Sequence, residues 1–261
     1  MNLYWFGRRA ELIGKELRVY LYDEDRFFFD ALKGKFSVDF TKYHQDFLGG
    51  ILDRPFRIGT SIGLLSSDGF VLLYVRDPNS YVYPRRFQVF GGILRYKNFL
   101  EKNAFQTFAR EVVVIKDGRF VLPKFNYFID DKIRSIYRMT IEKARMLPIP
   151  LPKDDTFEEV PFKKVYPCDA EPVTIKMFID NELTEISRGF FYYDEKLNSL
   201  ELVYLYEMPY KVSDVKLFSV EAFVNPVVAV PSEVLPSLKR DYFTPSTLPL
   251  LDVLGKCYEV V

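Results

Sequence analysis

One stretch, residues 63–111, constrains the fold of this chain more than any other. Just before it and within it, residues 58–65 and 70–76 are rich in apolar and β-branched side chains. The turn residues Ser67, Asp68 and Gly69 separate these two runs, which predicts an antiparallel β-hairpin. A third short strand, residues 87–90, runs into the glycine pair Gly91-Gly92. The chain is therefore expected to turn sharply between a small sheet and the segment that follows.

That following segment, residues 98–110, is expected to be an amphipathic helix. Phe99, Ala104, Phe105 and Phe108 recur at helical spacing, while charged and polar side chains fall on other faces. The β-branched run at residues 112–115 crowds a helix, and the Asp-Gly pair at residues 117–118 is typical of a hairpin turn. The helix is therefore expected to end near Arg110, and a second hairpin to follow.

Further along the chain, residues 130–146 predict another helix that ends before a proline cluster. The proline-rich and charged residues 148–172 are expected to form a long surface connection. Residues 188–193 and 200–206 predict an antiparallel pair of strands, and residues 246–254 a last helix.

Taken together, these features resemble the Nudix superfamily. The hairpin of residues 63–76 matches the strands that lead into the family's signature. Residues 87–92, Phe-Gln-Val-Phe-Gly-Gly, resemble its aromatic-x-x-Pro-Gly-Gly turn, and residues 109–112, Ala-Arg-Glu-Val, resemble its Arg-Glu-apolar core. Residues 221–235 look like its closing strand and short helix. The resemblance covers about residues 57–125 and 186–254.

The resemblance implies an α+β fold, with a Nudix-like mixed β-sheet sandwiched between helices. It also implies an N-terminal extension and a large internal insertion. We expect residues 1–55 to form the extension or a small subdomain, and residues 56–261 to form the Nudix-like domain. The insertion is expected at about residues 126–185.

In the Nudix family, carboxylates on one helix face collect Mg²⁺ or Mn²⁺, which are hard cations that need oxygen ligands. The metal ions neutralise a diphosphate and activate water. This chain departs from the family pattern: the segment from Gly92 to Arg110 is longer by about four residues, the first glutamate position falls on Lys102, and the Glu-Glu pair falls on Val114 and Ile115. These departures indicate a degenerate Nudix box.

The resemblance nevertheless implies a set of candidate site residues. Arg110 and Glu111 would be catalytic if the protein is active, and Mg²⁺ or Mn²⁺ would then be its cofactor. Tyr83 and Phe87 fall where Nudix-like pockets stack a base. The candidate substrate-binding residues are Gly91, Gly92, Arg76, Phe87 and Tyr83, and the candidate metal ligands are Glu111, Glu101 and Glu221.

Three hypotheses for the function stay open. The first is a Nudix-like protein without ordinary Nudix catalysis that binds a nucleotide, a nucleic-acid end or a protein partner through the Nudix cleft. The second is a divergent Mg/Mn-dependent pyrophosphohydrolase acting on a nucleoside diphosphate derivative. The third is a structural or interaction protein.

Composition excludes some classes of protein. Of the residues, 48% are hydrophobic and 17% are aromatic, which excludes a disordered chain. Lys plus Arg equals Asp plus Glu at 36 each, so net charge does not indicate a nucleic-acid partner. The apolar runs are strand-sized, so no membrane association is expected. The many charges and prolines are typical of a thermophile.

Cysteine usage leads to an expectation about the compartment. Cys168 and Cys257 lie far apart and form no metal-ligand spacing, so we expect neither a metal site nor a disulfide from them. A cytoplasmic location is the corresponding expectation.

Overall fold

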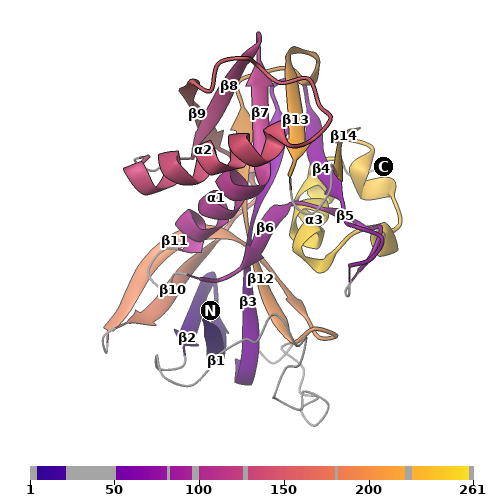
Figure 1. The fold of residues 1–261 in the computed structure, drawn as a ribbon. Helices are drawn as coiled ribbons and strands as arrows, with labels where there is room; N and C mark the ends of the chain where they lie inside the picture. Colours follow the sequence, from indigo (N-terminus) through magenta and orange to yellow (C-terminus); the bar gives the residue numbers. More distant parts are fainter. Residues whose placement is uncertain are drawn as a thin grey trace.

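The computed structural model describes residues 5–21, 51–80, 83–95, 100–125, 129–179, 182–220 and 225–258. These residues form a mixed, sheet-dominated structure with three α-helices (Figure 1). The helices are α1 (Leu100–Glu111), α2 (Asp131–Arg145) and α3 (Leu248–Cys257). The strands are β1 (Phe6–Ile13), β2 (Glu16–Leu21), β3 (Ile51–Ser66), β4 (Phe70–Val75), β5 (Phe87–Gln88), β6 (Phe90–Ile93), β7 (Val112–Lys116), β8 (Arg119–Phe125), β9 (Phe157–Lys164), β10 (Val173–Ile179), β11 (Glu182–Asp194), β12 (Ser199–Met208), β13 (Val215–Ser219) and β14 (Asn225–Pro231).

Two long strands, β3 and β12, organise the sheet. They run parallel, in register from Arg57 opposite Ser199 to Ser66 opposite Met208. From this pair, one closed circuit of pairings runs through β4, β14, β13, β7, β8 and β9. A second closed circuit runs through β1, β2, β10 and β11. Residues on β3 and β12 therefore lie where the two circuits meet.

The predicted hairpins are confirmed. β3 pairs antiparallel with β4, and the turn between them contains Gly69 with a positive φ of 83°. β7 pairs with β8 across Asp117 and Gly118, both of which also have positive φ, as the tight turn of an Asp-Gly hairpin requires. The antiparallel pairing of β11 with β12 matches the third predicted pair. Helix α1 ends at Glu111, one residue beyond the expected position, because the β-branched strand β7 begins at Val112.

The N-terminal strands join the same network of pairings. β1 pairs with β3, and β2 pairs in parallel with β10. The predicted boundary between residues 55 and 56 falls inside β3. The division into an extension and a Nudix-like domain stays a prediction.

Helix α1 differs from the amphipathic helix that its sequence predicts. Glu101 and Gln106 are buried together with the apolar face: α2 packs against α1, and Lys164 of β9 and Tyr206 of β12 contact Glu101. The Phe125 ring from β8 packs against α1 and makes edge contacts with four rings at centroid distances of 4.7–5.5 Å. Its partners are Phe105, Phe108, Phe162 and Tyr206. α1 is thus a central core helix.

Strand β12 is buried on both faces. Leu202 and Tyr204 belong to a core cluster that includes the apolar side chains of α1. Val203 and Leu205 belong to a second cluster that includes Leu250 of α3. The residues before α3, the 3₁₀ turn Pro245–Thr247, are therefore held close to the centre of the sheet.

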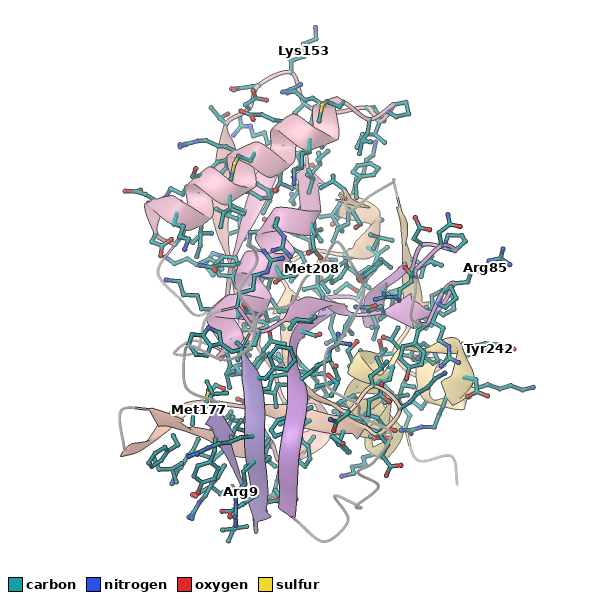
Figure 2. All side chains as sticks on the ribbon, turned by 60° about the horizontal axis from the view of Figure 1, so that its bottom comes forward. Arg9, Arg85, Lys153, Met177, Met208 and Tyr242 are labelled. Carbon is teal, nitrogen blue, oxygen red and sulfur yellow. A yellow bond between two sulfur atoms is a disulfide. The ribbon has the colours of Figure 1, made fainter. Side chains whose placement is uncertain are left out.

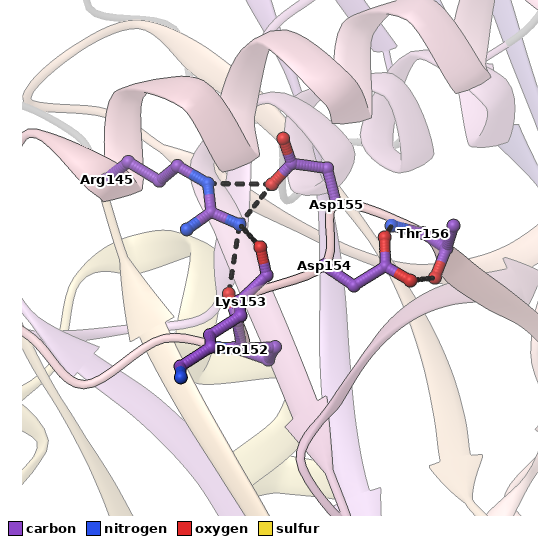
Figure 3. A network of polar contacts seen from close by, with 6 residues as sticks. All are labelled: Arg145, Pro152, Lys153, Asp154, Asp155 and Thr156. Atoms are coloured by element: carbon purple, nitrogen blue, oxygen red, sulfur yellow. Dashed lines mark hydrogen bonds and ion pairs between the residues drawn. The ribbon is translucent and has the colours of Figure 1, made fainter.

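Helix α2 begins as predicted and is followed by an ordered connection. The Asp130 side chain caps the helix by accepting a hydrogen bond from Ile133 N at 2.9 Å. At the other end, Arg145 Nε donates to Asp155 Oδ1 at 2.7 Å, and Arg145 Nη2 donates to the carbonyl oxygens of Pro152 and Lys153 (Figure 3). The expectation of a plain surface connection over residues 148–172 was wrong, because this segment contains β9, which pairs with β8 and β12.

The expectation about the cysteines was also wrong. Cys168 and Cys257 form a disulfide with a Cα–Cα distance of 5.2 Å, which joins the 3₁₀ turn Pro167–Asp169 to the end of α3. The reasoning from unpaired cysteines to a reducing compartment therefore loses its support. Among the described residues, no helix combines the length and the apolar composition needed to cross a membrane.

Candidate functional site

A pocket of about 430 Å³ lies between residues of β3, β4, β6, β12 and the end of α1. Residues 244–246, which precede α3, close one side of it. Four arginines line the pocket, namely Arg57, Arg76, Arg95 and Arg110. Three carboxylates line it as well, namely Asp77, Glu111 and Glu201. The pocket size lies within the range of small-molecule sites.

Most of the residues that the sequence singled out lie in this lining. They are Arg76, Tyr83, Gly91, Gly92, Arg110 and Glu111. Phe87 and Glu101 lie outside the lining. Glu221 falls outside the described residues. Arg85, two residues after Tyr83, is exposed and points away from the body of the molecule (Figure 2).

Glu111 occupies the last position of α1 and is almost fully buried. Its Oε1 forms an ion pair with Nη2 of the adjacent Arg110. Its carbonyl oxygen accepts a hydrogen bond from Val220 N at 2.7 Å. Val220 directly follows β13, which pairs with β7, so this bond fixes the end of α1 against β13. Glu111 is thus held rigidly at the pocket with a positive neighbour.

The glycine pair lets β6 approach β3 closely. A Cβ atom on Gly91 would lie 2.4 Å from the carbonyl oxygen of Thr60, so a larger residue would push the strands apart. The loop after β6 is tied to α1, since Arg95 N donates to Asn103 Oδ1 at 2.9 Å and Asn103 Nδ2 donates to Thr60 Oγ1 at 2.6 Å. These bonds hold the Arg95 backbone in place beside the pocket.

Arg76 follows β4 directly and carries an unsatisfied donor. Its Nη1 donates to Gln88 Oε1 at 2.5 Å, which orients the guanidinium in the pocket. Its Nε is buried and has no hydrogen-bond acceptor in the described part of the chain. Because a buried donor without an acceptor costs free energy, this atom favours a ligand that brings an acceptor.

Glu201 is a site residue that the sequence reasoning missed. It lies on β12 opposite Gly59 of β3, and a Cβ atom on Gly59 would lie 2.0 Å from Glu201 Oε2. Its Oε1 accepts a hydrogen bond from Ser199 at 2.6 Å. Burial raises the pKa of the Glu201 carboxyl, while the Ser199 bond and the guanidinium of Arg57 oppose the rise. The signal in the sequence was a single glutamate between two leucines of an apolar strand.

Tyr83 is anchored at the edge of the pocket. Its hydroxyl donates to Asp194 Oδ2 at 2.8 Å, and its backbone φ of 51° lies in the left-handed region. Burial, and then the bond to Asp194, raise the pKa of the Tyr83 hydroxyl well above its usual range. Two cations lie over the ring, with Arg86 Cζ at 4.8 Å and Lys196 Nζ at 5.4 Å from its centroid. The tyrosine therefore stays neutral, and the two cations over its ring add positive charge beside the pocket.

The remaining predicted residues contribute to the core. The Phe87 ring packs against Phe243 with centroids 5.8 Å apart. Glu101 is buried at the other end of α1, where its Oε2 pairs with Lys164 Nζ at 2.9 Å and its Oε1 accepts a hydrogen bond from Tyr206. Ten residues of helix place Glu101 about 15 Å from Glu111, which is too far for a shared metal ion.

The donor set of the pocket suits an anion better than a cation. In the residues that the structure describes, no three His, Cys, Asp or Glu side chains are grouped so that they could hold a metal ion. Four guanidinium groups face three carboxylates, and the pKa of one of these, Glu201, is raised. The site can therefore bind a negatively charged ligand through charge-assisted hydrogen bonds.

No protein-family model and no curated protein matches this chain. Among solved structures, the chain is similar to a MutT protein from Methanosarcina mazei Go1, at 11% identity and a TM-score of 0.41, over 80% of this chain and 96% of that one. It is also similar to a NUDIX-family hydrolase from Clostridium perfringens, at 10% identity and a TM-score of 0.30, over 77% of this chain and 93% of that one. Similarity at these TM-scores carries no argument about activity, which leaves the pocket as the basis for a function.

Proposed function

We propose that this protein binds a nucleoside diphosphate or a related nucleotide in the arginine-lined pocket, as a Nudix-like protein without ordinary Nudix catalysis. The observation that carries the proposal is the convergence of four arginines on one pocket from separate segments of the chain. Arginine suits phosphate because its planar group donates two parallel hydrogen bonds. A diphosphate carries the charge that such a set of donors can balance.

The other side chains of the pocket support a nucleotide over a bare anion. Tyr83 and Tyr74 are among the lining residues, and the edge of an aromatic ring can contact a base. The volume of about 430 Å³ is larger than a phosphate group needs. A nucleotide uses both the charged and the aromatic parts of the pocket.

Ordinary Nudix catalysis fits the helix poorly. Val114 and Ile115 stand at the family's Glu-Glu position and are buried in β7, where they form part of the core. Glu111 is the one carboxylate that α1 brings to the pocket. A single helix carboxylate gives Mg²⁺ one of the several oxygen ligands that it requires.

A screen of nucleoside diphosphate derivatives with Mg²⁺ or Mn²⁺ tests the proposal, with wild type compared with Glu111→Gln. Binding is followed by calorimetry and turnover by release of phosphate-containing products. We expect binding without turnover in both proteins. Turnover by wild type that Glu111→Gln abolishes would contradict the proposal and favour a divergent pyrophosphohydrolase. Absence of binding across the screen would leave a structural or interaction protein.

A further inference from the structure

We propose that the pocket holds the diphosphate of its ligand through arginine side chains and without a divalent cation. This inference rests on the proposed function. It reverses what the Nudix resemblance implies, because that family uses Mg²⁺ or Mn²⁺ held by helix carboxylates. Three features of the pocket carry it.

The first feature is that each carboxylate of the pocket already has a donor from the protein. Glu111 pairs with Arg110, and Glu201 accepts from Ser199. Asp77 Oδ1 accepts a hydrogen bond from Asn79 N at 2.6 Å. These donors orient the carboxylates toward the protein, and within the described residues no three ligating side chains are grouped so that they could hold a metal ion.

The second feature is the origin of the four arginines. Arg57 is on β3, Arg76 follows β4, Arg95 follows β6 and Arg110 is on α1. Bringing four like charges from separate elements to one pocket is unfavourable unless negative charge is present. The three carboxylates offset part of the positive charge, and the diphosphate of a ligand supplies further negative charge.

The third feature is the unsatisfied Nε of Arg76. A cation offers no acceptor for a buried N–H group, whereas a phosphate oxygen does. Gln88 fixes the guanidinium through Nη1, so the group loses little further freedom when a ligand binds. Arg76 is therefore the residue that most directly marks the pocket for an anion.

Calorimetry on the full chain tests the inference with ADP, inorganic pyrophosphate and adenosine. Each compound is titrated once in EDTA and once in excess Mg²⁺. We expect ADP and pyrophosphate to bind in EDTA at least as tightly as in Mg²⁺, because Mg²⁺ neutralises the charge that the arginines recognise. Adenosine, which lacks the diphosphate, is expected to bind at least about tenfold more weakly than ADP.

Two variants locate the effect. Arg76→Gln is expected to weaken ADP binding in EDTA by about tenfold or more, because one charge-assisted donor is lost. Arg119→Gln removes the same charge from an exposed position on β8, outside the lining, and is expected to leave ADP binding unchanged. Thermal unfolding of both variants verifies that they fold.

The outcomes separate the inference from the proposed function. ADP binding that requires Mg²⁺ would overturn the inference and leave the proposed function standing. Failure of ADP and pyrophosphate to bind in either buffer would overturn both. Because the comparison of EDTA with Mg²⁺ uses wild type alone, it decides the inference even if Arg76→Gln does not fold.

Discussion

Replacing Glu101 by glutamine separates a structural role from a role in metal binding. The sequence pattern placed Glu101 beside the first glutamate position of the Nudix box, whereas the structure buries it against Lys164 and Tyr206. The side chain is 5% exposed and that of Lys164 is 13% exposed. Glu101→Gln keeps the size of the side chain and removes its charge. The ammonium group of Lys164 then stays buried with no counter-ion at 2.9 Å.

The expected loss of stability follows from that burial. Removing one partner of a buried ion pair typically costs about 3–5 kcal/mol, since the other charge is left uncompensated. We expect about 3 kcal/mol here, because Tyr206 can still donate to the amide oxygen and Lys164 retains some access to water. For a chain of this size, the loss corresponds to a fall in melting temperature of roughly 6–12 °C.

Urea unfolding followed by circular dichroism measures the change. Glu142→Gln, at an exposed position on α2, is the matched control and is expected to change the free energy of unfolding by less than about 0.5 kcal/mol. The double variant Glu101→Gln, Lys164→Met is expected to regain part of the loss, because it leaves no buried ammonium. ADP binding by Glu101→Gln is expected to match that of wild type below the unfolding transition.

Two results would contradict a structural role for Glu101. If Glu101→Gln unfolds at the same urea concentration as Glu142→Gln, the pair with Lys164 does not stabilise the fold. If Glu101→Gln instead abolishes binding of Mg²⁺ to an otherwise stable protein, Glu101 is a metal ligand.

Three further predictions concern the core, the pocket and the disulfide. Phe125→Ala removes a ring that contacts four others and is expected to lower the free energy of unfolding by about 4 kcal/mol, measured in urea. A loss below about 1 kcal/mol would show that these aromatic rings are loosely packed. The pKa of Glu201 is raised in the folded state, so the free energy of unfolding is expected to fall as pH rises above about 4.5. Glu201→Gln is expected to make this fall with pH less steep. An unchanged dependence of the free energy of unfolding on pH would contradict the burial of the carboxyl. Reduction of the Cys168–Cys257 disulfide opens a link across 89 residues and is expected to cost about 4–5 kcal/mol. Unfolding with and without reductant, on wild type and on Cys168→Ser, measures this loss. Equal stability would mean that the link does not form in solution.

Local features of the fold were predictable from sequence. The turns at Gly69 and Gly118 require positive φ, and the end of α1 follows from the β-branched residues after Glu111. The cap at Asp130 likewise depends on residues within one turn of helix. Each of these features is decided by neighbours in the chain.

Features that depend on distant pairings were not predictable. Glu201 reaches the pocket because β12 runs parallel to β3, and Glu101 is buried because Lys164 of β9 and Tyr206 of β12 lie against it. The disulfide forms because the turn at Cys168 lies against the end of α3. None of these approaches leaves a periodic signal in the sequence, since each joins segments that the chain separates widely.

A crystal structure of the protein with ADP, grown in EDTA, shows directly whether the arginines hold the diphosphate without a metal ion. We expect the diphosphate to lie in the arginine-lined pocket, with a phosphate oxygen within hydrogen-bond distance of Arg76 Nε and no metal ion beside it. A diphosphate bound elsewhere on the molecule, or one bound in the pocket only after Mg²⁺ is added and through that ion, would contradict this expectation.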